Sequence, residues 1–257
     1  MIRPYILAET NWKALKETRF EVAVLPWGAT EAHNYHLPYG TDIIEADALA
    51  AAAAAYAWER GGKVVVLPTI PFGVNTGQSD IYLDINMNPT TQLAILDDIA
   101  ATLSRQGLRK LVVFNSHGGN NFKALLRELG LRYPDLLICL AEWFRALDRS
   151  GFDVAPGDHA DEVETSLLLH LRPELVLPRD QWGSGASRSF KIQGLREGWA
   201  WSERKWSQAT VDTGVGDPAR ATAEKGRRIA EALTGQIGRF FLDLCQADAG
   251  DLYEDAP

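Results

Sequence analysis

Short apolar runs rich in β-branched residues alternate along the chain with longer segments of helical period. The apolar runs predict strands at 20–28, 63–70, 110–115 and 136–143. The helical segments predict helices at 45–62, 90–107, 120–133, 161–171 and 218–245, the last with a bend near Gly235 or Gly238. Continuous apolar strands alternating with helices are typical of a parallel sheet covered on both faces. The pattern therefore predicts an α/β fold over residues 1–257: a single-domain three-layer sandwich with a mostly parallel central sheet and helices on both faces.

Composition narrows the class of protein. The chain of 257 residues is 46% hydrophobic and carries a formal net charge of −8, which disfavours a nucleic-acid partner because that partner requires a basic surface. Cys139 and Cys245 lie far apart and form no CxxC pair, which favours a reducing compartment. The N-terminal residues, MIRPYILAETNW, contain no apolar signal core, and no segment approaches the length of a membrane span. We therefore expect a cytoplasmic protein that binds neither nucleic acid nor membrane.

Two polar segments follow predicted strands. EAHNYHLPYGTD, residues 31–42, comes after the first strand, and SHGGNN, residues 116–121, comes directly after the third. Ligands of parallel α/β sheets bind beyond the carboxyl ends of the strands. We therefore expect these two segments to meet at one edge of the sheet, although they are far apart in sequence.

The side chains in these segments suit a metal ion. Carboxylate oxygen and imidazole nitrogen together favour Zn²⁺, Mn²⁺ or Fe²⁺. Glu31 and His33 point to the same side of an extended segment and could bind one metal or two neighbouring ones. Leu37-Pro38 and Gly40 would turn the chain so that Asp42 returns to the same pocket. The alternative for this segment is a surface loop with exposed histidines.

His117 is followed by two glycines at the expected start of a helix. Free backbone N–H groups there can meet an oxyanion, and Gly118 and Gly119 allow a ligand to approach the backbone closely. A plain glycine-rich helix start with Asn120 as its N-cap is the alternative. We assign Gly118 and Gly119 to substrate binding, together with Asn75 from the segment 71–91.

A third polar segment, GDHADEVETS, spans residues 157–166. Asp161 and Glu162 fit the usual preference for acidic residues at a helix N-terminus. Glu164 lies deeper, on the face shared with Leu168 and Leu171, and an inward carboxylate needs a cation or a hydrogen-bond donor. A metal ion would meet that need.

Three ordered blocks, LPWGATEAHNYHLPYGTD, NSHGGNN and HADEVETS, resemble the creatininase (creatinine amidohydrolase) family of metal-dependent amidohydrolases over residues 22–171. The resemblance implies a site with two divalent metal ions per subunit (Zn, Mn or Fe) and a homohexamer. Asp42 matches the ligand that bridges the two ions. The positions that match family metal ligands are Glu31, His33, Asp42 and His117. His36 matches a position that we expect to support the loop.

Asn34 replaces the glycine that the family pattern has between its two histidines, and the chain departs from the family at three further places. Gly119 stands where creatininase has a further glutamate ligand. We expect Glu164 to replace it at the second metal; the alternative is that this metal binds weakly. Ala155 stands where creatininase has a tryptophan, and the segment 71–91 differs from the corresponding loop of relatives. The last two departures fall on the substrate side, so we do not expect creatinine itself to be the substrate.

These residues predict a metal-dependent hydrolase that cleaves a C–N bond of a small amide or cyclic amide through a hydroxide activated by two metals. His159 matches the family histidine that moves protons near the substrate, and Glu162 could orient it or relay protons. The alternative is a catalytically inactive protein that binds a small ligand on the same fold. A redox enzyme that holds iron in the same ligands is a third interpretation.

Overall fold

The computed structural model describes residues 2–254, and its centre is a four-stranded sheet in the order β2-β1-β3-β4. Every neighbouring pair of strands is parallel. The strands are β1 (Val22–Trp27), β2 (Val64–Val66), β3 (Lys110–Asn115) and β4 (Leu137–Glu142). The predicted α/β fold with a parallel sheet is confirmed.

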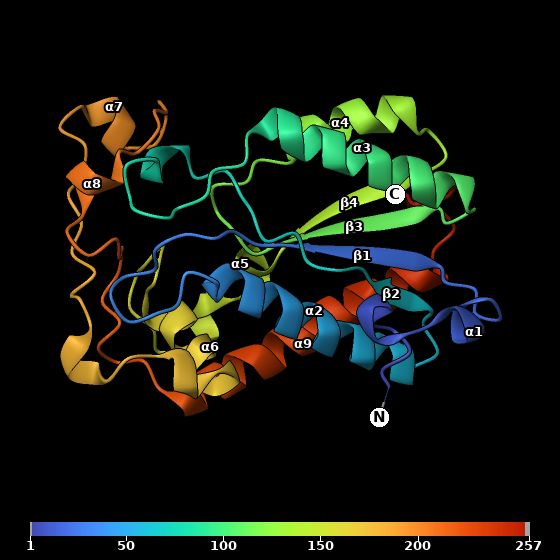
Figure 1. The fold of residues 1–257 in the computed structure, drawn as a ribbon, viewed down its shortest axis with the longest axis horizontal. Coiled ribbons are helices and arrows are strands. Elements are labelled where there is room, and N and C mark those ends of the chain that lie inside the picture. Colours follow the sequence, from blue (N-terminus) through green and yellow to red (C-terminus); the bar gives the residue numbers. More distant parts are fainter. Residues whose placement is uncertain (1, 255–257) are drawn as a thin grey trace.

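Helices cover both faces of this sheet (Figure 1). On one face lie α3 (Pro89–Arg105) and α4 (Lys123–Arg132), and on the other lie α2 (Thr41–Glu59), α6 (Glu162–Leu171) and α9 (Ala223–Gln246). The short helices are α1 (Trp12–Leu15), α5 (Trp143–Ala146), α7 (Gln193–Arg196) and α8 (Trp206–Ala209). The 3₁₀ turns are η1 (Leu7–Glu9), η2 (Thr76–Gln78), η3 (Arg149–Gly151), η4 (Pro173–Leu175) and η5 (Arg179–Gln181). The three predicted layers are therefore present.

The strands are apolar throughout because each of their faces is covered. Val22 and Val24 join the core beneath α2, α6 and α9, whereas Leu25 and Trp27 join the core beneath α3 and α4. Successive side chains of a strand point to opposite faces, so both sets of positions must be hydrophobic.

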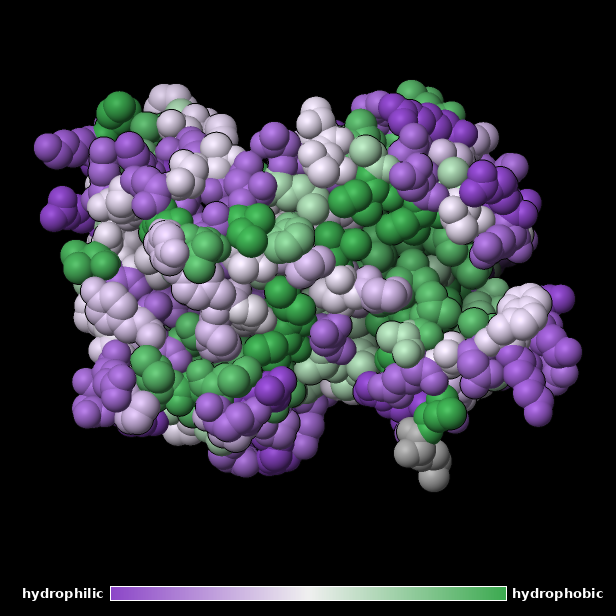
Figure 2. Space-filling view, viewed as in Figure 1, coloured by the Kyte–Doolittle hydropathy of each residue, from purple (hydrophilic) through white to green (hydrophobic). Residues whose placement is uncertain are grey.

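Hydrophobic residues also gather between the two helical layers on the face shown in Figure 2, where β2 forms the edge of the sheet. Part of that edge is covered, because Ile6 forms a parallel bridge to Val66. Within residues 2–254, no helix is both long enough and apolar enough to cross a membrane.

Several element boundaries differ from those predicted. The helix expected from residue 45 begins at Thr41, so Asp42 lies in its first turn. The expected strand 63–70 has only three residues, although Ile70 still forms an isolated parallel bridge to Trp27 of β1. The last helix begins at Ala223, after Thr222, whose side chain accepts a hydrogen bond from the backbone N–H of Lys225. It continues as one helix through Gly235 and Gly238, where we expected a bend.

The strand order determines where a ligand can bind. The chain leaves β1 toward α2 on one face and leaves the neighbouring β3 toward α4 on the other. When the connections after two adjacent parallel strands lead to opposite faces of the sheet, a crevice opens at the carboxyl ends of those strands. The loops that follow β1 and β3 start at this crevice.

Candidate metal centre

Side chains from three separate segments meet at the crevice. Glu31 comes from the loop after β1, Asp42 from the first turn of α2, and His117 from the loop after β3, and at most 6% of each is exposed. Nδ1 of His117 lies 2.8 Å from Oε1 of Glu31 and 3.0 Å from Oδ2 of Asp42. Neither carboxylate oxygen has a hydrogen-bond partner within residues 2–254. Three ligand atoms thus converge without hydrogen-bond geometry, which is the arrangement that a cation needs.

A second group of ligand atoms shares Asp42 with the first. Nε2 of His33 lies 3.1 Å from Oδ1 of Asp42. One ligand atom each from His33, Asp42 and Glu164 lie within 4.8 Å of one another. The two oxygens of Asp42 therefore face different histidines, Oδ2 toward His117 and Oδ1 toward His33. This is how a carboxylate that bridges two ions is arranged.

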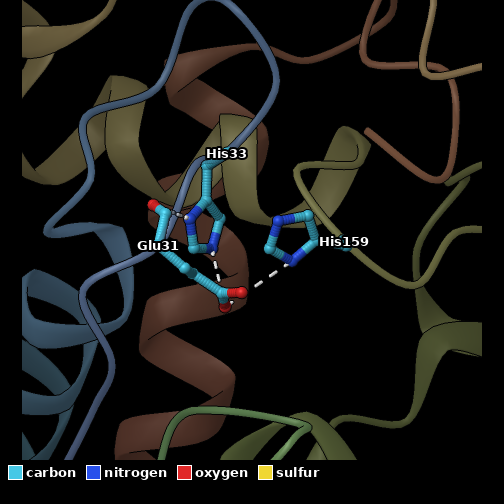
Figure 3. A group of neighbouring side chains, drawn as sticks. All are labelled: Glu31, His33 and His159. Atoms are coloured by element: carbon cyan, nitrogen blue, oxygen red, sulfur yellow. Dashed lines mark hydrogen bonds and ion pairs between the residues drawn. The ribbon is translucent and has the colours of Figure 1, made fainter. Parts of the chain in front are cut away.

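His159 borders the same cluster (Figure 3). Its Nδ1 lies 3.8 Å from Oε1 of Glu31, and its ring centroid lies 4.1 Å from that of His33. Glu31, His33 and His159 also form a group whose ligand atoms lie within 4.8 Å of one another. His159 is therefore close enough to act on anything that is bound beside Glu31.

Backbone carbonyls orient all three histidines. Nδ1 of His33 donates to the carbonyl oxygen of Glu31 at 3.1 Å, Nε2 of His117 to that of Val74 at 3.0 Å, and Nε2 of His159 to that of Ala32 at 2.8 Å. A carbonyl oxygen only accepts, so the proton of each neutral ring sits on that nitrogen. The other nitrogen of each ring faces the carboxylates, and in the neutral ring it carries the lone pair that could bind a metal ion. Histidines that bind metals are commonly fixed in this way.

Gln78 is a residue of the site that we did not predict. It is buried in η2, and its Nε2 donates to Oε2 of Glu31, which leaves Oε1 of Glu31 to face the histidines. Nothing in the sequence pattern marks this position, because the contact spans 47 residues.

A second buried residue that we missed is Glu45, which is acidic. It is fully buried on α2, and neither carboxylate oxygen has a hydrogen-bond partner among the residues described. Burial and the neighbouring charges of Glu164 and Asp42 raise its pKa well above the ordinary value. Glu45 follows Asp42 by three residues and so shares a helix face with it, a spacing that could have identified it.

Burial and the neighbouring charges shift the pKa values of several groups in the cluster. Burial lowers the pKa of His33, but the carboxylates of Asp42 and Glu31 outweigh it and raise that pKa to about 10. The same opposition, with Glu31 as the main charge, raises the pKa of His117. Burial raises the pKa of Glu164 to about 8. Divalent cations would compete with protons for all of these groups.

The cluster opens into a cavity of about 940 Å³ that is also lined by the three predicted substrate-binding residues, Asn75, Gly118 and Gly119. Around Gly118 there is open space. A Cβ atom on Gly119, by contrast, would overlap with Nε2 of His117 and with the carbonyl oxygen of Val74. The close approach of the chain to His117 thus accounts for this glycine.

Asn75 supports the loops around the cavity. Its Nδ2 donates to the carbonyl oxygens of Thr30 and Ile85, at 3.1 and 3.2 Å. These bonds tie the segment after β2 to the loop that carries Glu31.

Glu162 lies away from the cluster. It is fully buried, its Oε2 accepts from the backbone N–H of Ala155 at 2.8 Å, and its Oε1 pairs with Nζ of Lys225 on α9. His36 is also outside the donor groups, as we expected: its Nε2 contacts Oγ1 of Thr165 at 2.9 Å, and its ring stacks on Trp182. Glu162 thus links α6 to α9, and His36 links the loop after β1 to α6.

The chain is similar to several known proteins. A family model described as creatininase, creatinine amidohydrolase, matches residues 8–241. A protein of Mycobacterium ulcerans (strain Agy99) named mycofactocin precursor peptide peptidase is 32% identical over 226 residues, which are 84% of this chain and 83% of that protein. The creatinine amidohydrolase of Pseudomonas putida is 28% identical over 203 residues, 68% of this chain and 75% of that enzyme.

Solved structures share the fold. A crystal structure of a protein from Bacteroides fragilis NCTC 9343 that is named for creatinine amidohydrolase has a TM-score of 0.92 and 44% identity. The match covers 99% of this chain and 100% of that one. A creatininase structure named for its manganese has a TM-score of 0.73 at 21% identity, covering 94% of this chain and 98% of that one. The chain belongs to the creatininase family of hydrolases.

Proposed function

We propose that this protein is a hydrolase that cleaves an amide C–N bond and binds two divalent metal ions, Zn, Mn or Fe. The observation that carries the proposal is the pair of donor groups that share Asp42 through its two oxygens. The buried oxygens of Glu31 and Asp42 that lack hydrogen-bond partners within residues 2–254 support it, because buried charged groups require a counter-charge.

The residues divide into two ligand sets. Glu31, Asp42 and His117 would hold one ion, and His33, Asp42 and Glu164 would hold the other. Glu164 supplies the carboxylate that Gly119 cannot. Ions bound in these sets supply Lewis-acid chemistry, lowering the pKa of a water molecule and polarising a carbonyl oxygen.

His159 is suited to moving a proton. Burial and the neighbouring His33 lower its pKa, so the ring is neutral near pH 7. Its Nε2 is held by the carbonyl of Ala32, and Nδ1 faces the cluster with a free lone pair. In our proposal Nδ1 accepts a proton from the attacking water and returns it to the leaving nitrogen, as a general base and then a general acid. Glu162 takes no part in this scheme, because Lys225 and Ala155 occupy it.

Two substrate classes fit the proposal. A small amide or cyclic amide is the class that the family resemblance implies. An amide bond near the end of a short peptide is the second, and two observations favour it: the mycobacterial relatives are named peptidases, and the cavity of about 940 Å³ has room for more than a small ring.

The decisive experiment combines elemental analysis with hydrolysis assays on cyclic amides and short peptides. His117→Ala should lose one of the two proposed ions and activity together, whereas His170→Ala, which changes an exposed histidine of α6, should lose neither. Turnover that survives in His117→Ala would contradict the metal-dependent mechanism. A wild-type protein that binds metal and ligands but cleaves no amide would support the alternative of an inactive binding protein.

A further inference from the structure

One wall of the cavity is made by residues 201–204 and Trp206, which lie in a segment without any sequence period. This wall packs directly on η2. A Cβ atom on Gly77 would overlap with the carbonyl oxygen of Arg204, so the two backbones touch only because residue 77 is glycine. Gln78, the next residue, holds Glu31. The wall is therefore fixed in position relative to the metal centre.

Arg204 and Trp206 place a positive charge beside His159. The ring of Trp206 meets the ring of His159 edge to face, with 4.7 Å between centroids. The guanidinium carbon of Arg204 lies 4.8 Å from the centre of the Trp206 ring. Arg204 is thus separated from the proposed proton carrier by a single indole ring, and both wall residues line the cavity.

The guanidinium group of Arg204 has only one side-chain partner among the described residues, and that partner is exposed. Nη2 donates to Oδ2 of Asp158 at 2.7 Å, but the side chain of Asp158 is 61% exposed, and solvent weakens such a pair. Nη1 is buried and has no acceptor among the residues that the structure describes. A buried guanidinium nitrogen without an acceptor is destabilising. A ligand that brings an acceptor would remove that cost.

The other arginines of the cavity differ in this respect. Arg149 bonds to Oδ2 of Asp161 at 3.0 Å and to the carbonyl oxygen of Gly157 at 3.2 Å. The side chain of Arg145 is 70% exposed and pairs with Glu142. Of these three cations, Arg204 best combines a rigid position, contact with the site and an unused buried donor.

We propose that the substrate carries a carboxylate, which Arg204 binds while the scissile amide lies beside Glu31 and His159. This inference rests on the proposed amide hydrolysis and names its substrate class as a carboxylate-bearing amide, such as an N-acyl amino acid or the end of a peptide. A planar guanidinium matches a carboxylate with two parallel hydrogen bonds, and stacking on Trp206 holds the guanidinium plane in place.

The test is a binding measurement, which does not depend on turnover. A panel of N-acetyl amino acids is prepared, each as the free acid and as the carboxamide, and titrated calorimetrically into metal-loaded protein. The wild type should bind the best free acid about 10- to 100-fold more tightly than its carboxamide, the range expected for a charge-assisted hydrogen-bonded pair. Arg204→Met should lose that preference and Arg204→Lys should retain part of it. Arg145→Met is the matched control and should keep the full preference.

Two results would overturn the proposal. A preference for acids that survives in Arg204→Met would mean that the metal ions hold the carboxylate. Equal affinity for both forms throughout the panel in the wild type would mean that the carboxylate is not recognised. Hydrolysis of the bound compounds is measured separately. If the wild type prefers the free acids through Arg204 but hydrolyses none of them, the proposed hydrolase is contradicted and the carboxylate site is not. Metal content and thermal stability of each variant exclude a folding defect as the cause.

Discussion

Replacing Glu164 by Gln should remove one of two stabilising metal ions and leave the other in place. Glu164 contributes only to the group with His33 and Asp42, whereas Glu31, Asp42 and His117 form the other group without it. A carboxamide oxygen is a much weaker ligand than a carboxylate for these divalent cations. The variant should therefore bind one ion, whereas we expect the wild type to bind two.

The size of the effect follows from linkage and from chain length. A ligand that binds only the folded state stabilises it by about 2.7 kcal/mol when its concentration is 100 times its Kd. For a chain of 257 residues, the entropy of unfolding is roughly 0.5 kcal/mol per kelvin, so each kcal/mol shifts Tm by about 2 °C. One ion should raise Tm by about 5 °C, and two ions by about 10 °C.

The assay is thermal unfolding of chelator-treated protein during titration with Mn²⁺ or Zn²⁺, accompanied by elemental analysis. The wild type should show the full increase in Tm, and Glu164→Gln about half of it. Glu142→Gln is the matched control, because Glu142 lines the same cavity but belongs to none of the donor groups found among residues 2–254. Two bound ions in Glu164→Gln would refute the assignment of Glu164, and no metal-dependent shift in the wild type would refute the metal centre.

Two further predictions concern the supports of the site. Gly119→Ala should lose about 1–3 kcal/mol of stability and about 10- to 100-fold in metal affinity, because the added Cβ would displace His117. Gly118→Ala should be nearly neutral, because the space around Gly118 is open. Equal stability and equal metal affinity of the two variants in calorimetry would contradict this reasoning. Burial lowers the pKa of His36 to about 4. Between about pH 6.5 and 4, the unfolded chain therefore binds a proton at His36 that the folded protein does not bind. Stability should therefore fall as the pH drops through about 6.5, level off near 4, and lose at most about 3 kcal/mol in all. Chemical denaturation of His36→Gln should show a flatter pH profile, and a profile as steep as that of the wild type would contradict the assignment.

The sequence predicted the strands and the sheet-flanking helices because their patterns are local and both faces of the sheet are covered. It also brought Glu31, His33 and His117 together, since the carboxyl ends of adjacent parallel strands meet at one edge. The early start of α2 at Thr41 places Asp42 on the first turn of a helix and not on a returning loop. A returning loop and the first turn of α2 would both bring Asp42 to the same crevice. The prediction that Asp42 joins the site therefore did not depend on where the helix begins.

The remaining parts of the site arise from contacts that no local pattern records. Gln78 meets Glu31 across 47 residues, and Lys225 meets Glu162 across 63. From the sequence, Glu162 was a candidate for orienting His159 or relaying protons, but its partner Lys225 lies on the last helix. Arg204 and Trp206 belong to a segment whose position depends on packing against η2, so its spacing alone could not place them.

Gly119 and Glu164 together show how the second donor group depends on the packing of distant helices. A side chain at position 119 is excluded by the contact with His117, so a carboxylate for this group must come from another element. It comes from α6, whose position is fixed against α9 where a Cβ on Gly226 would overlap with the carbonyl oxygen of Ser166. A larger residue at 226 would push α6 away and carry Glu164 with it. The proposed second metal therefore depends on a helix–helix contact on the far side of α6, whereas the first depends on the loops at the end of the sheet.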